Sequence, residues 1–157
     1  MDLDSKIPTK KDIIEEIKVL EYIIEETEIR IGSELIWLWV AIDNKTKRIL
    51  RLSISKQRKM FIAERFIADL VKNHGKHPIS TDGETWYSQA CRFLKLRHHT
   101  YSAYEKSIIE RTMQYIKDRT EGFDDYFPCS KENCKLKHVQ NWLTLFLSMH
   151  NKEVINA

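Results

Sequence analysis

Three strand-like runs follow one another closely in the first third of the chain. They are "YIIEETEIRI" (22–31), "ELIWLWVAID" (34–43) and "KRILRLSIS" (47–55), each rich in β-branched and aromatic residues. The short segments "GSE" and "NKT" lie at the two junctions. Connections this short join antiparallel neighbours, because a parallel return needs a crossover of roughly a dozen residues or more. The three runs therefore predict an antiparallel meander.

The rest of the chain alternates between helical and strand patterns. Apolar residues at helical spacing predict helices over 59–75, 84–95, 107–120 and 137–150, and strand signals cover 77–82 and 96–101. The first of these helices ends at Gly75 as a C-cap, and its inward face is predicted to hold Met60 or Phe61 with Ala63, Phe66, Ile67, Leu70 and Val71. Strands separated by helices usually run parallel through right-handed crossovers. We therefore predict an α/β fold: a mixed five-stranded sheet, three antiparallel strands then two parallel, flanked by helices.

Length and composition favour one domain with a core of its own. We expect this domain over 22–150, after an extension (1–21) with one short helix (9–20) and before a tail (151–157). No apolar run approaches the roughly 20 residues of a membrane span, and the N-terminus lacks the apolar core of a signal peptide. These features predict an intracellular, cytoplasmic protein with no membrane partner. The net charge of +3 does not by itself identify a nucleic-acid partner.

Cysteine and histidine residues leave two smaller questions open. Cys129, Cys134 and His138 lie in "CSKENCKLKH", a spacing that loosely suggests zinc. A structural zinc site needs four ligands and no fourth lies nearby, so we predict loop and helix residues with zinc as the alternative. His98 and His99 lie in the weak fifth strand, where we expect one to face the core and the other solvent.

Three acidic residues stand out by their positions. Glu25 interrupts the first predicted strand, Asp82 ends the fourth, and Glu110 lies on the helix 107–120 beside its apolar stripe. If the first and fourth strands are neighbours, the three carboxylates converge and require a cation, for which Mg²⁺ is suited. Two such ions would suit phosphoryl transfer. The alternative is a set of solvated surface carboxylates, with Glu110 paired to Lys106 one helical turn away.

Three segments resemble a known protein family. "IIEETEIRIGSELIWLWVAID", "ISTDGETWY" and "SIIERTMQYIKDRTEGFDDYFPC" are similar, in order and spacing, to the catalytic domain of insertion-sequence transposases with an Asp-Asp-Glu (DDE) triad. The resemblance covers about residues 22–150. It implies an RNase H-like fold, Mg²⁺ or Mn²⁺ as cofactor with two ions, no small-molecule cofactor, and DNA as partner. It also implies DNA strand cleavage followed by transfer of the freed 3′-hydroxyl to target DNA.

The resemblance places the family triad on Glu25, Asp82 and Glu110. Trp86 and Tyr87 match the "WY" after the second Asp, and we predict that both pack the following helix on the sheet. The residues for which phosphate contacts are predicted are all basic: Arg58, Lys59, Arg111, Lys117 and Arg119.

The first triad position departs from the family, which has Asp where this chain has Glu25. Glutamate moves the carboxylate by about one C–C bond, roughly 1.5 Å, and a misplacement of about 1 Å can cost on the order of a hundredfold in rate. We therefore expect reduced or lost activity. Glu26 is not expected to substitute, because adjacent strand side chains point to opposite faces.

Three functions stay open on the sequence. One is a metal-dependent transposase or integrase domain, and another is an inactive, truncated or repurposed remnant that binds DNA or a partner transposase. The third is a nuclease of the same fold that only hydrolyses. About 21 residues precede the first strand, so recognition of element ends is expected to come from another chain or to be absent. The expected protein partner is a second copy of this chain or a full-length transposase.

Overall fold

The fold is built on a five-stranded sheet in the order β3-β2-β1-β4-β5. The computed structural model describes residues 20–31, 34–120 and 136–156. The strands are β1 (Tyr22–Ile31), β2 (Glu34–Asp43), β3 (Ile49–Ser55), β4 (Ile79–Thr81) and β5 (His98–Thr100). β1, β2 and β3 pair antiparallel, whereas β4 pairs parallel with both β1 and β5. The predicted mixed sheet is confirmed.

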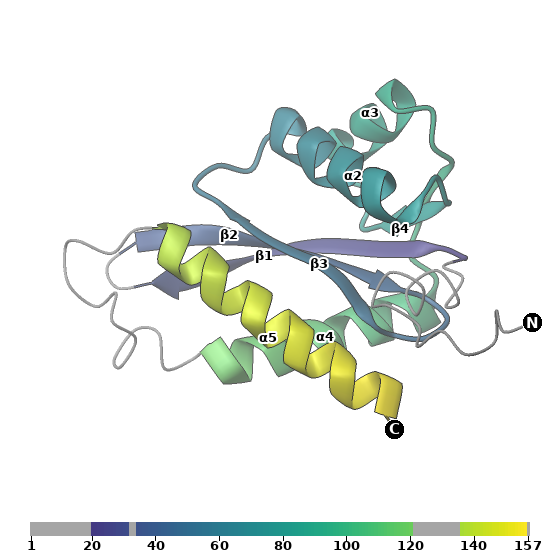
Figure 1. The fold of residues 1–157 in the computed structure, drawn as a ribbon. Coiled ribbons are helices and arrows are strands. Elements are labelled where there is room, and N and C mark those ends of the chain that lie inside the picture. The colour runs from purple at the N-terminus through teal and green to yellow at the C-terminus, as the bar shows by residue number, and fades with distance from the viewer. Residues whose placement is uncertain (1–19, 32–33, 121–135, 157) are drawn as a thin grey trace, which may run out of the picture.

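Helices cover both faces of this sheet (Figure 1). α2 (Met60–His74) and α3 (Thr85–Phe93) lie on one face, and α4 (Ala103–Thr120) and α5 (Leu136–Asn156) lie on the other. Alternate strand residues feed two cores, since successive side chains point to opposite sides. Ile23 and Val40 pack with α4 and α5, whereas Ile24 and Trp39 pack with α2 and α3. The same alternation decides which face each carboxylate of β1 reaches.

The inward face of α2 differs from its prediction at the first turn. Its buried residues are Ala63, Phe66, Ile67 and Leu70, and Val71 is partly buried. Met60 and Phe61 are instead 40% and 60% exposed, so the prediction that one of them faces inward is wrong. Phe61 lies two residues from Ala63, about 200° around the helix, and Met60 only opens the helix. Gly75 is confirmed as the C-cap: at φ +92° its N–H donates to the Val71 carbonyl, 2.7 Å away.

The start of α4 is fixed by a capping box. The helix begins at Ala103, ahead of the predicted residue 107. The Ser102 N–H donates to Glu105 Oε1 (2.9 Å), and the Glu105 N–H donates back to Ser102 Oγ (3.1 Å). This reciprocal pair satisfies two backbone donors that a helix start otherwise leaves without partners. The first turn of the helix that carries Glu110 is therefore held in place.

Some sequence predictions fall outside the described residues. The helix expected over 9–20 is one, and the zinc alternative for Cys129, Cys134 and the side chain of His138 is another. Among the described residues, no helix combines the length and the apolar character needed to cross a lipid bilayer.

Candidate active site between β1, β4 and α4

Glu25 lies on the α4 side of the sheet. It is half-buried and pairs across the strands with Val40, a core residue on that side. The parallel register joins Tyr22 to Ile79 and Ile23 to Ser80. Continuing that register by two residues places Asp82, which directly follows β4, beside Glu25. The prediction that strands one and four are neighbours is therefore confirmed.

Glu110 approaches from the covering helix. It is exposed on α4 and follows the fully buried Ile109. Among the ion pairs of described residues, none joins Glu110 to Lys106. Burial, followed by the charges of Glu26, Asp82 and Glu110, raises the pKa of Glu25 to about 7, while Lys117 lowers it. Asp82 and Glu110 thus both act electrostatically on Glu25.

The carboxylate oxygens of Glu25, Asp82 and Glu110 are not already gathered around one metal position. Within the described part of the chain, the residues whose metal-ligating atoms all lie within 4.8 Å of one another are Glu21, His99 and Glu105. Glu25, Asp82 and Glu110 do not meet this spacing. Shared coordination of one ion by the triad therefore requires rotation of its side chains, for which the exposed Glu110 has room.

The raised pKa of Glu25 predicts a pH-dependent stability. Its ordinary value is 4.5, so the folded protein holds a proton that the unfolded chain releases near pH 4.5. Stability is then highest below that pH and falls as the pH rises through about 7. We expect the metal-free protein to lose more thermal stability between about pH 5 and 8 than its Glu25→Gln variant. Parallel melting-temperature curves for the two proteins would contradict this, and Glu28→Gln, an exposed change on the same strand, is the control.

The turn after β4 fixes the direction of Asp82. Its Oδ1 accepts a hydrogen bond from the Glu84 N–H (3.0 Å), and Thr81 Oγ1 accepts one from the Gly83 N–H (3.0 Å). Gly83 has φ +90°, and a Cβ at this position would lie 2.7 Å from Thr100 Cγ2. Glycine is therefore required directly after Asp82, both by the backbone conformation and by the space available.

Glu26 lies on the opposite face of the sheet from Glu25, as strand alternation predicts. Its side chain is 3% exposed, its Oε2 accepts a short hydrogen bond from the Tyr87 hydroxyl, and its Oε1 lies 3.6 Å from the Arg58 guanidinium. Tyr87 is fully buried and Trp86 is partly buried, both packed on the α2–α3 core. The packing predicted for the "WY" pair is confirmed, but this buried acid with its phenol partner was not predicted.

Tyr101 is a residue near the site that sequence reasoning missed. Its hydroxyl donates a short hydrogen bond to the Ile24 carbonyl, one residue before Glu25. Burial, then the charges of Glu25 and Asp82, raises the pKa of this phenol, so it stays protonated. Its position directly after β5, level with Asp82 after β4, is the signal that was available in the sequence.

The predicted phosphate-binding residues divide between the two faces. Arg111, Lys117 and Arg119 share α4 with Glu110. Arg111 donates to Ser107 Oγ (3.2 Å), and the guanidinium of Arg119 lies 3.5 Å from the Tyr115 ring centroid. On the α2 side, Lys59 is exposed at the N-cap of α2. Arg58 contacts Glu26 and stacks over the rings of Trp37 (4.1 Å) and Trp86 (4.6 Å), so it also has a role inside the fold.

The two histidines of β5 point in different directions, as predicted. His98 is half-buried, with Nε2 2.7 Å from Thr81 Oγ1. His99 is exposed at 45% of its side chain and lies between Glu21 and Glu105.

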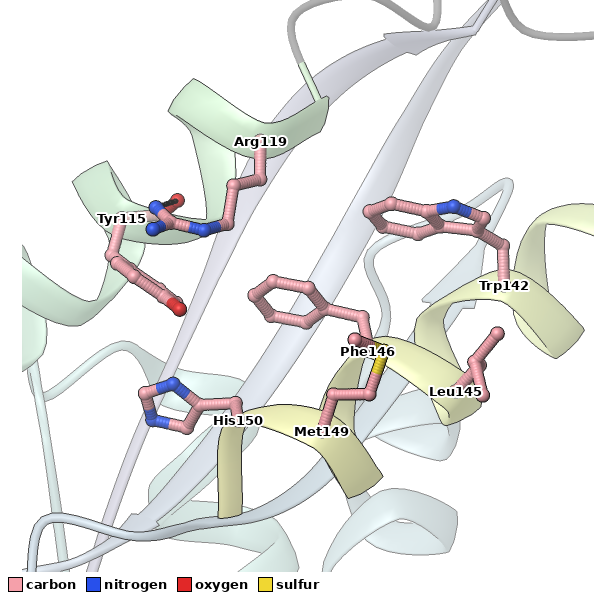
Figure 2. A pocket seen from close by; sticks show the side chains of 7 residues that line it. All are labelled: Tyr115, Arg119, Trp142, Leu145, Phe146, Met149 and His150. Carbon is pink, nitrogen blue, oxygen red and sulfur yellow. Dashed lines mark hydrogen bonds between the residues drawn. The ribbon is translucent and has the colours of Figure 1, made fainter. Parts of the chain in front are cut away.

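A cavity of about 310 Å³ lies between α4 and α5, away from these carboxylates. Figure 2 shows its lining: Tyr115 and Arg119 from α4, with Trp142, Leu145, Phe146, Met149 and His150 from α5. Apolar and aromatic side chains dominate it, and none of its residues is acidic. The cavity therefore offers a surface for contact and no ligand set for a metal.

Known proteins match most of this chain in sequence. The DDE domain family matches residues 19–150. An uncharacterized protein of Methanocaldococcus jannaschii is 31% identical over 129 residues, which are 82% of this chain and 59% of that protein. The chain therefore spans less than two thirds of this relative's length.

Solved structures share the fold at low identity. The catalytic core domain of HTLV-2 integrase in complex with magnesium aligns with a TM-score of 0.58 and 17% identity, over 80% of this chain and 82% of that one. A chain of the simian T-cell lymphotropic virus intasome aligns with a TM-score of 0.62 and 19% identity, over 83% of this chain and 47% of that one. The sheet order and covering helices are thus those of an integrase catalytic core, an RNase H-like fold.

Proposed function

Because this chain belongs to the family of DDE-type transposase and integrase catalytic domains, we propose that it carries out metal-dependent DNA strand cleavage and 3′-hydroxyl strand transfer. DNA is the proposed partner, in the cytoplasm, and a second copy of this chain or a full-length transposase is the proposed protein partner. The observation that carries the proposal is the convergence of Asp82 and Glu110 on Glu25: the pairing of β1 with β4 brings Asp82 beside Glu25, and Glu110 on α4 lies near enough to raise the pKa of Glu25. These three residues come from a strand, the end of another strand and a helix that are far apart in the sequence.

The donor set fits divalent ions. Burial, followed by the charges of Glu26, Asp82 and Glu110, raises the pKa of Glu25 to about 7, and a cation relieves the repulsion between carboxylates. The three carboxylates would hold Mg²⁺ or Mn²⁺, all-oxygen ligation being what these ions prefer. When bound, two such ions supply charge stabilisation for in-line displacement at phosphorus.

The chain's own residues have separate tasks in this proposal. Asp82 is directed by its turn, and Glu110 is presented by a helix whose first turn is capped. Glu25 must give up its proton before it can act as a ligand. Arg111, Lys117 and Arg119 lie along the same helix as Glu110 and would contact DNA phosphates, so binding should weaken as salt rises.

A second candidate function is a remnant that binds DNA or a partner without cleaving. Two features favour it: a glutamate where the resemblance implies aspartate, and carboxylates whose oxygens are not gathered as closely as those of Glu21, His99 and Glu105. Both lower the expected rate without removing the fold or the basic helix.

Product analysis tests the proposed function. The full chain is incubated with Mn²⁺ or Mg²⁺, a labelled oligonucleotide with a free 3′-hydroxyl, and plasmid DNA. We expect joined products from the wild type and background levels from Asp82→Asn, which keeps the size of the side chain but removes its charge. Hydrolysis without joining would indicate a nuclease. No metal-dependent product from the wild type, with retained DNA binding, would favour the remnant.

A further inference from the structure

A second group of metal-type ligands lies outside the triad, where β1, β5 and α4 meet. His99 Nε2 is 2.9 Å from Glu21 Oε1 and 3.4 Å from Glu105 Oε1. Glu21 directly precedes β1, His99 is in β5, and Glu105 is in the first turn of α4. We propose that Glu21, His99 and Glu105 bind one first-row divalent metal ion of the Zn²⁺ type, which fastens the start of α4 to the sheet.

The spacing of the three side chains suits a single ion. All their ligand atoms lie within 4.8 Å of one another. Ligands about 2.1 Å from a tetrahedral ion lie about 3.4 Å apart, which is the His99–Glu105 separation. The His99–Glu21 contact would lengthen by about half an ångström. Solvent reaches the group through His99, since 45% of its side chain is exposed.

The three side chains already contact one another. Glu21 Oε1 is inaccessible to solvent and has the His99 imidazole nitrogen, 2.9 Å away, as its ion-pair partner. The side chains of Glu21 and Glu105 also interact directly. The other oxygens have hydrogen-bond donors. Asn44 Nδ2 lies 3.4 Å from Oε2 of both glutamates, and Glu105 Oε1 accepts the Ser102 N–H. Side chains that ligate metals are commonly held by such outer hydrogen bonds.

This site and the triad differ in the types of their ligands and therefore in the metal ions they favour. An imidazole with two carboxylates favours Zn²⁺ and similar ions, whereas an all-carboxylate set favours Mg²⁺ or Mn²⁺. The inference goes beyond strand transfer and does not depend on it. It concerns the anchoring of the helix that carries Glu110.

Zinc binding to a chain without competing ligands tests the proposal. The background is the full chain with Asp82→Asn, Glu110→Gln, Cys129→Ser and Cys134→Ser, which removes two triad carboxylates and the thiols. We expect calorimetry to find one Zn²⁺ per chain in excess Mg²⁺, and Co²⁺ to give the visible absorption of a nitrogen- and oxygen-bound ion. Absence of Zn²⁺ binding in this background would overturn the site.

Single substitutions in that background identify the ligands. His99→Gln should raise the Kd for Zn²⁺ by at least roughly 10–100-fold, because losing only a hydrogen-bond partner of a metal ligand already costs that much. Glu105→Gln should do the same while it keeps the capping box, which accepts either residue. His98→Gln is the matched control on the same strand and should leave the Kd unchanged. A Kd that His99→Gln does not change would show that His99 and the two glutamates form an ion pair only.

Discussion

Shortening Glu25 to aspartate is expected to raise the rate of metal-dependent DNA cleavage by roughly a hundredfold. The change withdraws the carboxylate by about 1.5 Å and introduces the aspartate that the resemblance to the family implies at this position. Mg²⁺ tolerates little departure from octahedral geometry, so the gain should be larger with Mg²⁺ than with the more permissive Mn²⁺. The measurement is the initial rate of plasmid nicking for wild type and Glu25→Asp at equal protein concentration.

Two further variants make this result interpretable. Glu28→Asp is the same chemical change on the same strand, but at an exposed position, and it should leave the rate unchanged. Glu25→Asp combined with Asp82→Asn should return the rate to background, because the gain must act through the triad. A fall in rate on Glu25→Asp would instead mean that the site is adapted to the longer side chain.

Removing the Tyr87 hydroxyl is expected to destabilise the fold by about 2 kcal/mol, as leaving a buried hydrogen-bonding group without its partner does. The hydroxyl donates to Glu26, whose side chain is 3% exposed. In Tyr87→Phe, Oε2 of Glu26 stays buried without its hydroxyl donor. The Arg58 guanidinium then remains as the charged partner of this side chain, 3.6 Å from the other oxygen, Oε1. For a chain of this size the melting temperature should fall by roughly 4–8 °C.

Tyr104→Phe provides the matched control for that measurement. It removes the same hydroxyl from a side chain that is 62% exposed, where a change within about 0.5 kcal/mol is expected. The double variant Tyr87→Phe with Glu26→Gln should be less destabilised than additivity predicts, since the partner no longer carries a charge. Additive losses would show that the Tyr87–Glu26 contact contributes little.

Strand bounds, side-chain alternation and helix starts depend on neighbouring residues, and these are the features that the sequence predicts best. The first two strands have the predicted bounds, because β-branched runs and short junctions leave little choice of register. Alternation along β1 is enough to place Glu25 and Glu26 on opposite faces. The S-x-x-E signature of Ser102 and Glu105 marks the start of α4, whereas the apolar stripe of this helix begins only at 108.

Contacts between distant segments could not be predicted in the same way. Tyr87 and Glu26 are 61 residues apart, and only the packing of α3 on the sheet brings them together. The same holds for Glu21, His99 and Glu105, which come from three different elements. Isolated charged or polar residues give no sequence pattern that predicts such contacts. Only the fold shows that they lie side by side.

Glu25 and Glu26 are neighbours on β1 and point to opposite faces of the sheet. Only the backbone of β1 therefore separates the two carboxylates. Among the charged neighbours that raise the pKa of Glu25, Glu26 on the far side is the first. The environment of Glu26 is set by Tyr87 and Arg58, neither of which reaches the α4 face. A substitution at Tyr87 in α3 should therefore change the proton affinity of Glu25 by way of Glu26, although Tyr87 lies on the other face of the sheet.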